Sequence, residues 1–149
     1  MGCGSKRTVL VVDDDAALRL LCRVHLEKAG FHVVEASDGD EAVEQVHADR
    51  PDVILLDIMM PLVSGWQVAA DVLNDRSTDE IPIIFISALT RREDRLRAFG
   101  LGAVGYLTKP FDPALLAPTI GALLDQIDRG ERSAVIAENI EKLRAEVSD

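Results

Sequence analysis

Two of the most apolar runs in this chain end in carboxylates. Asp13 and Asp14 follow residues 9–12, and Asp57 follows residues 53–56. If the two runs are neighbouring parallel strands, their carboxyl ends meet at one edge of the sheet and the three acids lie together. Clustered carboxylates repel one another and raise each other's pKa, so such a group needs a cation or a lysine nearby. Hard oxygen ligands in a water-accessible site suit Mg²⁺, and these positions therefore predict a magnesium site.

Two other apolar runs end in groups that complement the acids. Residues 82–86 lead to Ser87, a hydroxyl, and residues 104–107 are followed two positions later by Lys109, an ammonium. The ammonium supplies the positive charge that clustered carboxylates require. Asp15 does not belong to this set, because it stands directly before a helical pattern and is well placed to cap that helix. The sequence therefore predicts one polar crevice at the strand ends.

The elements that must position these groups alternate along the chain. Short apolar runs separated by longer segments of helical period are typical of a parallel sheet built from βα units. The expected strands are residues 9–12, 31–36, 53–56, 82–86 and 104–107, and the expected helices are residues 16–29, about 39–48, 66–74, about 90–100 and 113–128. Pro118 should kink or restart the fifth helix, residues 113–128, because proline lacks a backbone donor. We predict an α/β fold, a doubly wound five-stranded parallel sheet in the flavodoxin-like order 2-1-3-4-5.

The chain divides into three parts. Residues 8–128 hold the five βα units, and residues 1–7 are expected to be a flexible tail or a remnant of expression. Residues 129–149 form an extra C-terminal helix, with apolar positions at spacings of four, three and four. This narrow stripe is made of Ile136, Ile140, Leu143 and Val147. Three interpretations of the helix stay open: a strut packed on the domain, a dimerisation helix, or a linker to an output domain.

The composition excludes several classes of protein. The chain has 149 residues, and its 26 Asp or Glu against 16 Lys or Arg give a formal net charge of −10. This acidity argues against nucleic acid as a direct partner, because phosphates are held by Lys and Arg. The longest nearly apolar stretch, residues 115–124, is shorter than the roughly 20 residues of a spanning helix. With no secretory signal and only Cys3 and Cys22, we expect a cytoplasmic protein without disulfides or a zinc site.

The motifs at the strand ends, taken together and in chain order, resemble the receiver domain of two-component response regulators, including the single-domain chemotaxis type. The matching stretches are Val11-Val12-Asp13-Asp14, Leu55-Leu56-Asp57-Ile58-Met59-Met60-Pro61 with Gly65, Ile86-Ser87-Ala88, and Tyr106-Leu107-Thr108-Lys109-Pro110-Phe111. No single stretch is decisive, but the whole set in register is specific. The resemblance extends over the five βα units.

The resemblance implies a phosphoacceptor. Asp57 would take a phosphoryl group from a phosphohistidine on a histidine kinase or phosphotransfer protein. Asp13, Asp14 and Asp57 would bind Mg²⁺ together with the backbone carbonyl of Met59. Lys109 would neutralise charge on the transferring group, because such a transfer asks a protein mainly for in-line positioning and charge stabilisation.

The resemblance also implies a switch. Ser87 would bind a phosphoryl oxygen, and Tyr106 would follow into the space that the moving loop leaves. The surface that changes would be the face formed by the fourth helix, the fifth strand and the fifth helix, and it would control a downstream protein partner or a missing output domain. Family behaviour further implies a cis peptide bond between Lys109 and Pro110.

The same residues allow two other functions. A pseudo-receiver would keep the fold as an interaction module and would never carry phosphate. An aspartate-nucleophile phosphohydrolase would also use Asp57, but it needs a second Asp two residues later, where this chain has Met59. We therefore expect a self-phosphorylating relay protein with slow autodephosphorylation, not a metabolic enzyme.

Two further patterns are less specific. Residues 100–105 match G-x-G-x-x-G, but they lead from a helix into a strand, the reverse of the order that dinucleotide binding requires. The fourth helix is rich in arginine, which fits either an acidic docking partner or a solvated face. These arginines are Arg91, Arg92, Arg95 and Arg97.

Overall fold

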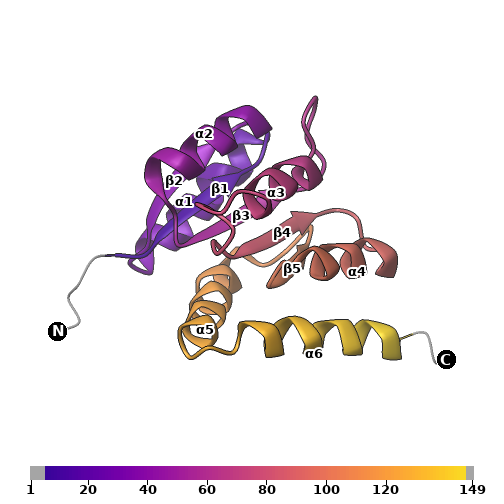
Figure 1. Ribbon diagram of the computed structural model, residues 1–149. Coiled ribbons are helices and arrows are strands. Elements are labelled where there is room, and N and C mark those ends of the chain that lie inside the picture. The colour runs from indigo at the N-terminus through magenta and orange to yellow at the C-terminus, as the bar shows by residue number, and fades with distance from the viewer. Residues whose placement is uncertain (1–5, 147–149) are drawn as a thin grey trace.

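Residues 6–146 are described by a computed structural model of the protein. Their five apolar runs form one parallel sheet in the order β2-β1-β3-β4-β5, as the sequence predicts (Figure 1). The strands are β1 (Thr8–Val12), β2 (His32–Ala36), β3 (Val53–Asp57), β4 (Ile83–Ser87) and β5 (Gly105–Thr108). The helices are α1 (Ala16–Lys28), α2 (Gly39–Asp49), α3 (Gly65–Leu73), α4 (Arg92–Leu101), α5 (Leu116–Asp128) and α6 (Arg132–Ala145), with a 3₁₀ turn η1 (Pro113–Leu115) before α5.

Helices cover both faces of the sheet, which explains why its strands are apolar on both sides. One core lies under α2, α3 and α4, and it includes Leu56, Val68 and Phe85. The other lies under α1 and α5, and it includes Cys22 and Ile120. Every residue of β3 and β4 is buried, so the strands that carry Asp57 and Ser87 form the centre of the fold.

The first three helices begin at side-chain caps, whereas α4, α5 and α6 have no side-chain cap. Asp15 accepts hydrogen bonds from the first-turn backbone of α1, which confirms it as a cap, and Asp38 and Ser64 do the same for α2 and α3. Helix α4 begins at Arg92, two residues after the start that the sequence predicted near Thr90. Leu89, in the loop before α4, is hydrogen-bonded to Ser87 of β4 and Tyr106 of β5, as described below.

Pro118 does not kink α5. The chain after Asp112 first makes the η1 turn and then restarts as an α-helix at Leu116. Pro118 therefore lies in the first turn of α5, where a backbone N–H has no partner within the helix. A restart is what the sequence predicted as one of two outcomes, and it occurs just before the proline.

At both ends of the described residues, the structure adds contacts that the sequence did not predict. Arg7 pairs with Asp125 and Asp128 of α5 at 3.2 and 2.7 Å, so the tail expected at residues 1–7 already contacts the fold at its last residue. Helix α6 buries Val135 and Leu143, whereas Val135 was not in the predicted stripe. The predicted stripe position Val147 lies outside the described residues, as do residues 1–5.

Across residues 6–146, none of the helices has the length and apolar content that crossing a membrane requires.

Candidate functional site

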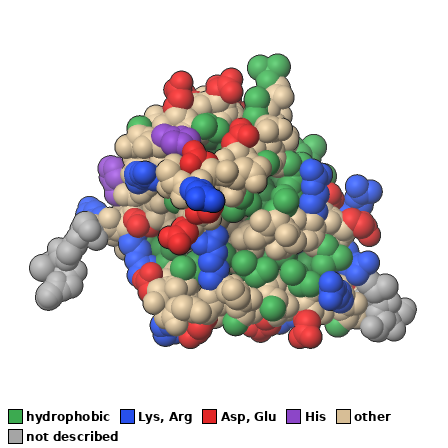
Figure 2. Space-filling model, in the orientation of Figure 1, with side chains coloured by type: hydrophobic (Ala, Val, Ile, Leu, Met, Phe, Trp, Pro, Cys, Tyr) green, Lys and Arg blue, Asp and Glu red, His purple; other side chains and the backbone are tan. Residues whose placement is uncertain are grey.

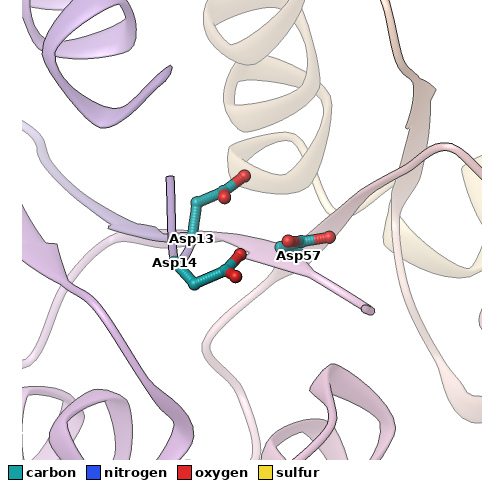
Figure 3. Close-up of side chains that lie close together, drawn as sticks. All are labelled: Asp13, Asp14 and Asp57. Atoms are coloured by element: carbon teal, nitrogen blue, oxygen red, sulfur yellow. The ribbon is translucent and has the colours of Figure 1, made fainter. Parts of the chain in front are cut away.

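The acids predicted to share a site do lie together. β1 and β3 are neighbours, with Val12 opposite Leu56, so Asp13 and Asp57 emerge side by side at the carboxyl edge. One carboxylate oxygen from each of Asp13, Asp14 and Asp57 lies within 4.8 Å of the others (Figure 3). Asp13 and Asp57 are buried, with 0% and 2% exposure, while Asp14 is exposed. The cluster therefore has a buried floor and one side open to water.

Lys109 reaches this cluster from the position directly after β5. Its Nζ lies 2.9 Å from Oδ2 of Asp13 and 3.4 Å from Oδ2 of Asp57. The backbone N–H of Lys109 donates to the carbonyl of Ser87 at 2.8 Å, which continues the pairing of β4 with β5 past the strand ends. The peptide bond to Pro110 is cis, which confirms the expectation from the family resemblance. The ammonium is thus fixed by backbone on the edge that carries the acids.

The electrostatics of the site are set by burial and by charge crowding. Burial and the charge of Asp13 raise the pKa of Asp57 to about 6, against the opposing effects of Lys109 and the Met59 backbone N–H. Burial lowers the pKa of Lys109, but the hydrogen bond and charge of Asp13 outweigh it, and the pKa lies above its ordinary value. Lys109 therefore stays protonated at neutral pH, and Asp57 is mostly ionised.

The donor set fits a hard divalent cation. When ionised, Asp13, Asp14 and Asp57 carry three negative charges, and Lys109 returns only one. All the converging side-chain ligands are oxygens, and the open side at Asp14 leaves room for water, which Mg²⁺ keeps when it binds proteins. Met59 lies two residues after Asp57, and its backbone N–H donates to Oδ1 of Asp57 at 3.2 Å.

A further positioning residue, Arg19 of α1, was not recognised in the sequence. Its Nη1 donates to the backbone carbonyl of Asp13 at 2.7 Å, and its Nε pairs with Glu35 of β2 at 3.0 Å. This bridge holds the turn between β1 and α1. A basic residue one turn into a helix that follows an acidic strand end was the available signal, but it is common on surface helices.

Gly65 is required by the close approach of two backbone segments. A Cβ atom at this position would lie 2.2 Å from the carbonyl oxygen of Asp57 and 2.7 Å from the Cα of Ile58. The N–H of Gly65 donates to the carbonyl of Ile58 at 2.9 Å, which closes the loop between β3 and α3. The glycine in the sequence motif therefore packs against the residue that is expected to react.

Ser87 and Tyr106 are linked through the loop between β4 and α4. Ser87 is fully buried at the end of β4, one residue past the pairing of Asp57 with Ile86. Its Oγ accepts a hydrogen bond from the N–H of Leu89 at 3.0 Å. The hydroxyl of half-buried Tyr106 donates to the carbonyl of the same Leu89 at 2.7 Å. The loop after Ser87 is therefore held from both sides, which explains why α4 starts late.

A five-stranded sheet of order 2-1-3-4-5 whose carboxyl edge gathers three aspartates and a lysine defines a flavodoxin-like protein of the chemotaxis-receiver type. A family model described as "Response regulator receiver domain" matches residues 9–120. The chain belongs to this family of two-component signalling proteins, in which phosphorylation and magnesium binding are general features.

Similar proteins include both solved structures and longer regulators. The chemotaxis response regulator CheY4 of Vibrio cholerae is 32% identical, with a TM-score of 0.75 over 80% of this chain and 99% of that one. The phosphate regulon transcriptional regulatory protein PhoB of Escherichia coli is 41% identical over 81% of this chain and 53% of its own length. The probable transcriptional regulator ycf27 of Guillardia theta is 39% identical over 87% and 50%. The chain thus spans about half the length of these curated relatives.

Proposed function

We propose that the protein is a phosphorylation-controlled relay in which Asp57 accepts a phosphoryl group from a phosphohistidine. The donor would be a histidine kinase or a histidine phosphotransfer protein. The observation that carries the proposal is the position of Lys109, whose ammonium lies within 3.4 Å of carboxylate oxygens from both Asp13 and Asp57. A buried carboxylate that faces both a cation and further acids is suited to receive a phosphoryl group.

The transfer itself forms one bond and breaks another. A carboxylate oxygen of Asp57 attacks the phosphorus in line, the bond from phosphorus to the imidazole nitrogen breaks, and its electron pair stays on that nitrogen. The product is an acyl phosphate. Because this reaction depends on positioning and charge neutralisation, the fixed ammonium of Lys109 contributes directly by facing the oxygens that gain charge.

Magnesium fits the remaining needs of the site. Asp13, Asp14, Asp57 and the backbone carbonyl of Met59 would hold the ion, which when bound supplies positive charge to the phosphoryl oxygens. Arg19 then has a positioning role, because it fixes the turn that presents Asp13.

The response to phosphorylation would pass through Ser87 and Tyr106. A phosphoryl oxygen on Asp57 offers the Ser87 hydroxyl a charged acceptor, and charge-assisted hydrogen bonds are stronger than neutral ones. Moving Ser87 toward it disturbs the bond that Leu89 makes with Ser87 and, through Leu89, the bond that Tyr106 makes. The face formed by α4, β5 and α5 would then change its affinity for a downstream protein or for an output domain.

Two alternatives remain distinct from this proposal. A pseudo-receiver would bind partners without chemistry, although every position that the reaction needs is filled in this chain. A phosphohydrolase would turn over the phosphoryl group quickly, but Met59, 58% exposed at the position of the second acid, has no proton to give. We therefore expect an accumulating phosphoprotein with slow autodephosphorylation.

Intact-mass measurement after incubation with acetyl phosphate tests the proposal. We expect the wild-type protein to gain the mass of one phosphoryl group in the presence of Mg²⁺, and to gain none in excess chelator. Asp57→Asn, which keeps the shape but removes the nucleophile, should not gain this mass. The matched control is Asp71→Asn, at an exposed position of α3, which should behave like the wild type. Equal labelling of Asp57→Asn contradicts the proposed site, and donor consumption without accumulation favours the hydrolase.

A further inference from the structure

Helix α6 lies across the face formed by α4, β5 and α5 (Figure 1). After α5 the chain turns at Gly130, which has a φ of 79°, and returns along α4. Val135 and Leu143 are 6% and 5% exposed, and they lie on the same side of α6 as the partly buried Ile136 and Ile140. The apolar side of α6 therefore packs against the protein's own surface.

Polar contacts fix the position of α6 along this face. Nη1 of Arg92 donates to the backbone carbonyl of Leu143 at 3.4 Å, and Nη2 of Arg95 pairs with Glu146 at 3.3 Å. At the other end, Nη1 of Arg132 donates to the carbonyl of Glu80 at 2.6 Å. Two of the three arginines of α4 thus hold a helix of the same chain. Hydrophobic and charged side chains are interspersed along this side of the molecule (Figure 2).

A cavity of about 410 Å³ is lined by residues of α4, β5, α5 and α6. Its lining includes Phe99 of α4, Tyr106 of β5, Leu123 and Gln126 of α5, and Asn139 of α6. Tyr106 therefore lines the same space that α6 helps to close. A change in the position of the Tyr106 ring changes the surface on which α6 rests.

A short series of contacts joins this cavity to the acidic site. Ser87 accepts from the N–H of Leu89, and Tyr106 donates to the carbonyl of Leu89. The same loop leads directly into α4, whose arginines hold α6. Any rearrangement that draws Ser87 toward Asp57 therefore reaches both the floor of the cavity and the helix that anchors α6.

The polar part of this contact is weak. Helix α4 has no side-chain cap, and its buried residues are Ala98 and Phe99. Nε of Arg95 is buried and has no hydrogen-bond partner among the described residues. The packing of α6 on α4 therefore leaves one donor unsatisfied, which costs stability. The side chain of Glu146 is 50% exposed in its ion pair with Arg95. Exposed ion pairs of this kind contribute little to stability.

We propose that α6 covers the face formed by α4, β5 and α5 in the resting protein, and that phosphorylation of Asp57 releases α6 and exposes that face. This inference rests on the proposed function. The released face presents an apolar groove flanked by Arg92 and Arg95, and α6 competes with any partner that binds there.

Hydrogen exchange measured beside intact mass tests the release. With acetyl phosphate and Mg²⁺, amides of α6 should exchange at least about tenfold faster, within the usual range of coupling between sites. Amides of β1 and β3 should be unchanged. If the mass increases and α6 stays protected, the release is wrong while the proposed function stands. If no phosphoryl mass is gained, the proposed function fails and the release fails with it.

Variants of α6 test the same coupling from the other end. Leu143→Asp should expose α6 without any donor, and by reciprocity it should raise the labelled fraction at a fixed low donor concentration by about fivefold. Ala137→Asp places the same charge on the exposed side of α6 and should match the wild type. An unchanged labelled fraction in an α6-exposed Leu143→Asp protein overturns the coupling.

Exchanging the charges of Arg95 and Glu146 tests the same contact if the Leu143→Asp variant does not fold. Arg95→Glu should loosen α6, and the double variant R95E/E146R should restore its protection. Arg91→Glu, at the exposed start of α4, is the matched control. Failure of the double variant to restore protection contradicts the docking geometry. A labelled protein that doubles in mass with α6 still protected would place α6 in a second copy, and it would overturn release within one chain.

Discussion

The acidic edge of the sheet and the seam between α4 and α6 both consist of carboxylates facing cations, but the two regions have opposite physical character. At the edge, Asp13 and Asp57 are buried and are held by strand backbone, and Lys109 is fixed by its own N–H. At the seam, Arg95 and Glu146 keep 28% and 50% of their side chains exposed. Buried charges are expensive to leave unpaired, whereas exposed pairs contribute about 0–1 kcal/mol. The first arrangement suits chemistry, and the second suits a reversible contact.

We expect the largest effect on stability at Gly65, which packs against the acidic edge of the sheet. Gly65→Ala puts a methyl group 2.2 Å from the backbone oxygen of Asp57, where both neighbours are main chain and cannot rotate away. We expect a loss of about 3 kcal/mol or more in the free energy of unfolding, measured by urea denaturation. Labelling of the remaining folded protein should also be impaired, because the strain falls on Asp57 itself.

Gly121→Ala is the matched control for this substitution. Gly121 lies inside α5, and an added Cβ meets no heavy atom within 4 Å. Alanine is the better helix former, so this variant should gain about 0.5–1 kcal/mol. Equal and small effects of the two substitutions would show that the edge of the sheet is no more rigid than an outer helix, and would break the contrast.

The second effect in size is the loss of the fixed cation. Lys109→Ala removes the ammonium that faces Asp13 and Asp57, and we expect labelling by acetyl phosphate with Mg²⁺ to slow about 100-fold. Lys28→Ala, at the exposed end of α1, removes the same charge far from the site and should leave the rate unchanged. A Lys109→Ala rate within threefold of the wild type would mean that the buried pairing is structural only.

The smallest effect is expected at an exposed ion pair outside both regions. Nε2 of His47 lies 2.9 Å from Asp75, whose pKa is lowered to about 2 by bonds from His47 and Ser77. The bond to Asp75 raises the pKa of His47 above its ordinary 6.5. The Asp75 contribution is lost as pH falls below its ordinary 3.8 toward 2, and the His47 contribution is lost as pH rises above 6.5.

His47→Gln should therefore lower stability only slightly, and mainly between about pH 4 and 6.5. Urea midpoints measured across pH for this variant and for His32→Gln, an exposed residue of β2, test the expectation. If His47→Gln lowered stability as much as Gly65→Ala, an exposed ion pair would matter as much as the buried edge of the sheet, and the expected ranking would be wrong.

The site was largely predictable because chain order and sheet topology decide it. Strand ends are local features of the sequence, and order 2-1-3-4-5 necessarily brings Asp13 beside Asp57. The cap at Asp15 is equally local. The roles of these residues in phosphoryl transfer stay predictions, since they concern chemistry and not position.

What could not be predicted depends on contacts between distant segments. Helix α4 starts late because Leu89 is bonded to Ser87 and Tyr106, which no helical pattern records. The contact of Arg19 with the carbonyl of Asp13 is invisible for the same reason. The stripe of α6 predicted a helix but not its place, because an apolar face does not name the surface that covers it.

Locating the phosphoryl group is the most direct test of the central claim. Wild-type protein labelled with acetyl phosphate and Mg²⁺ is digested, and the modified peptide is fragmented in a mass spectrometer under conditions that preserve acyl phosphates. We expect the phosphoryl group on Asp57, within the peptide that contains β3. Its location on Asp13, Asp14 or any other residue, or a labelled protein whose β3 peptide is unmodified, would contradict Asp57 as the phosphoacceptor.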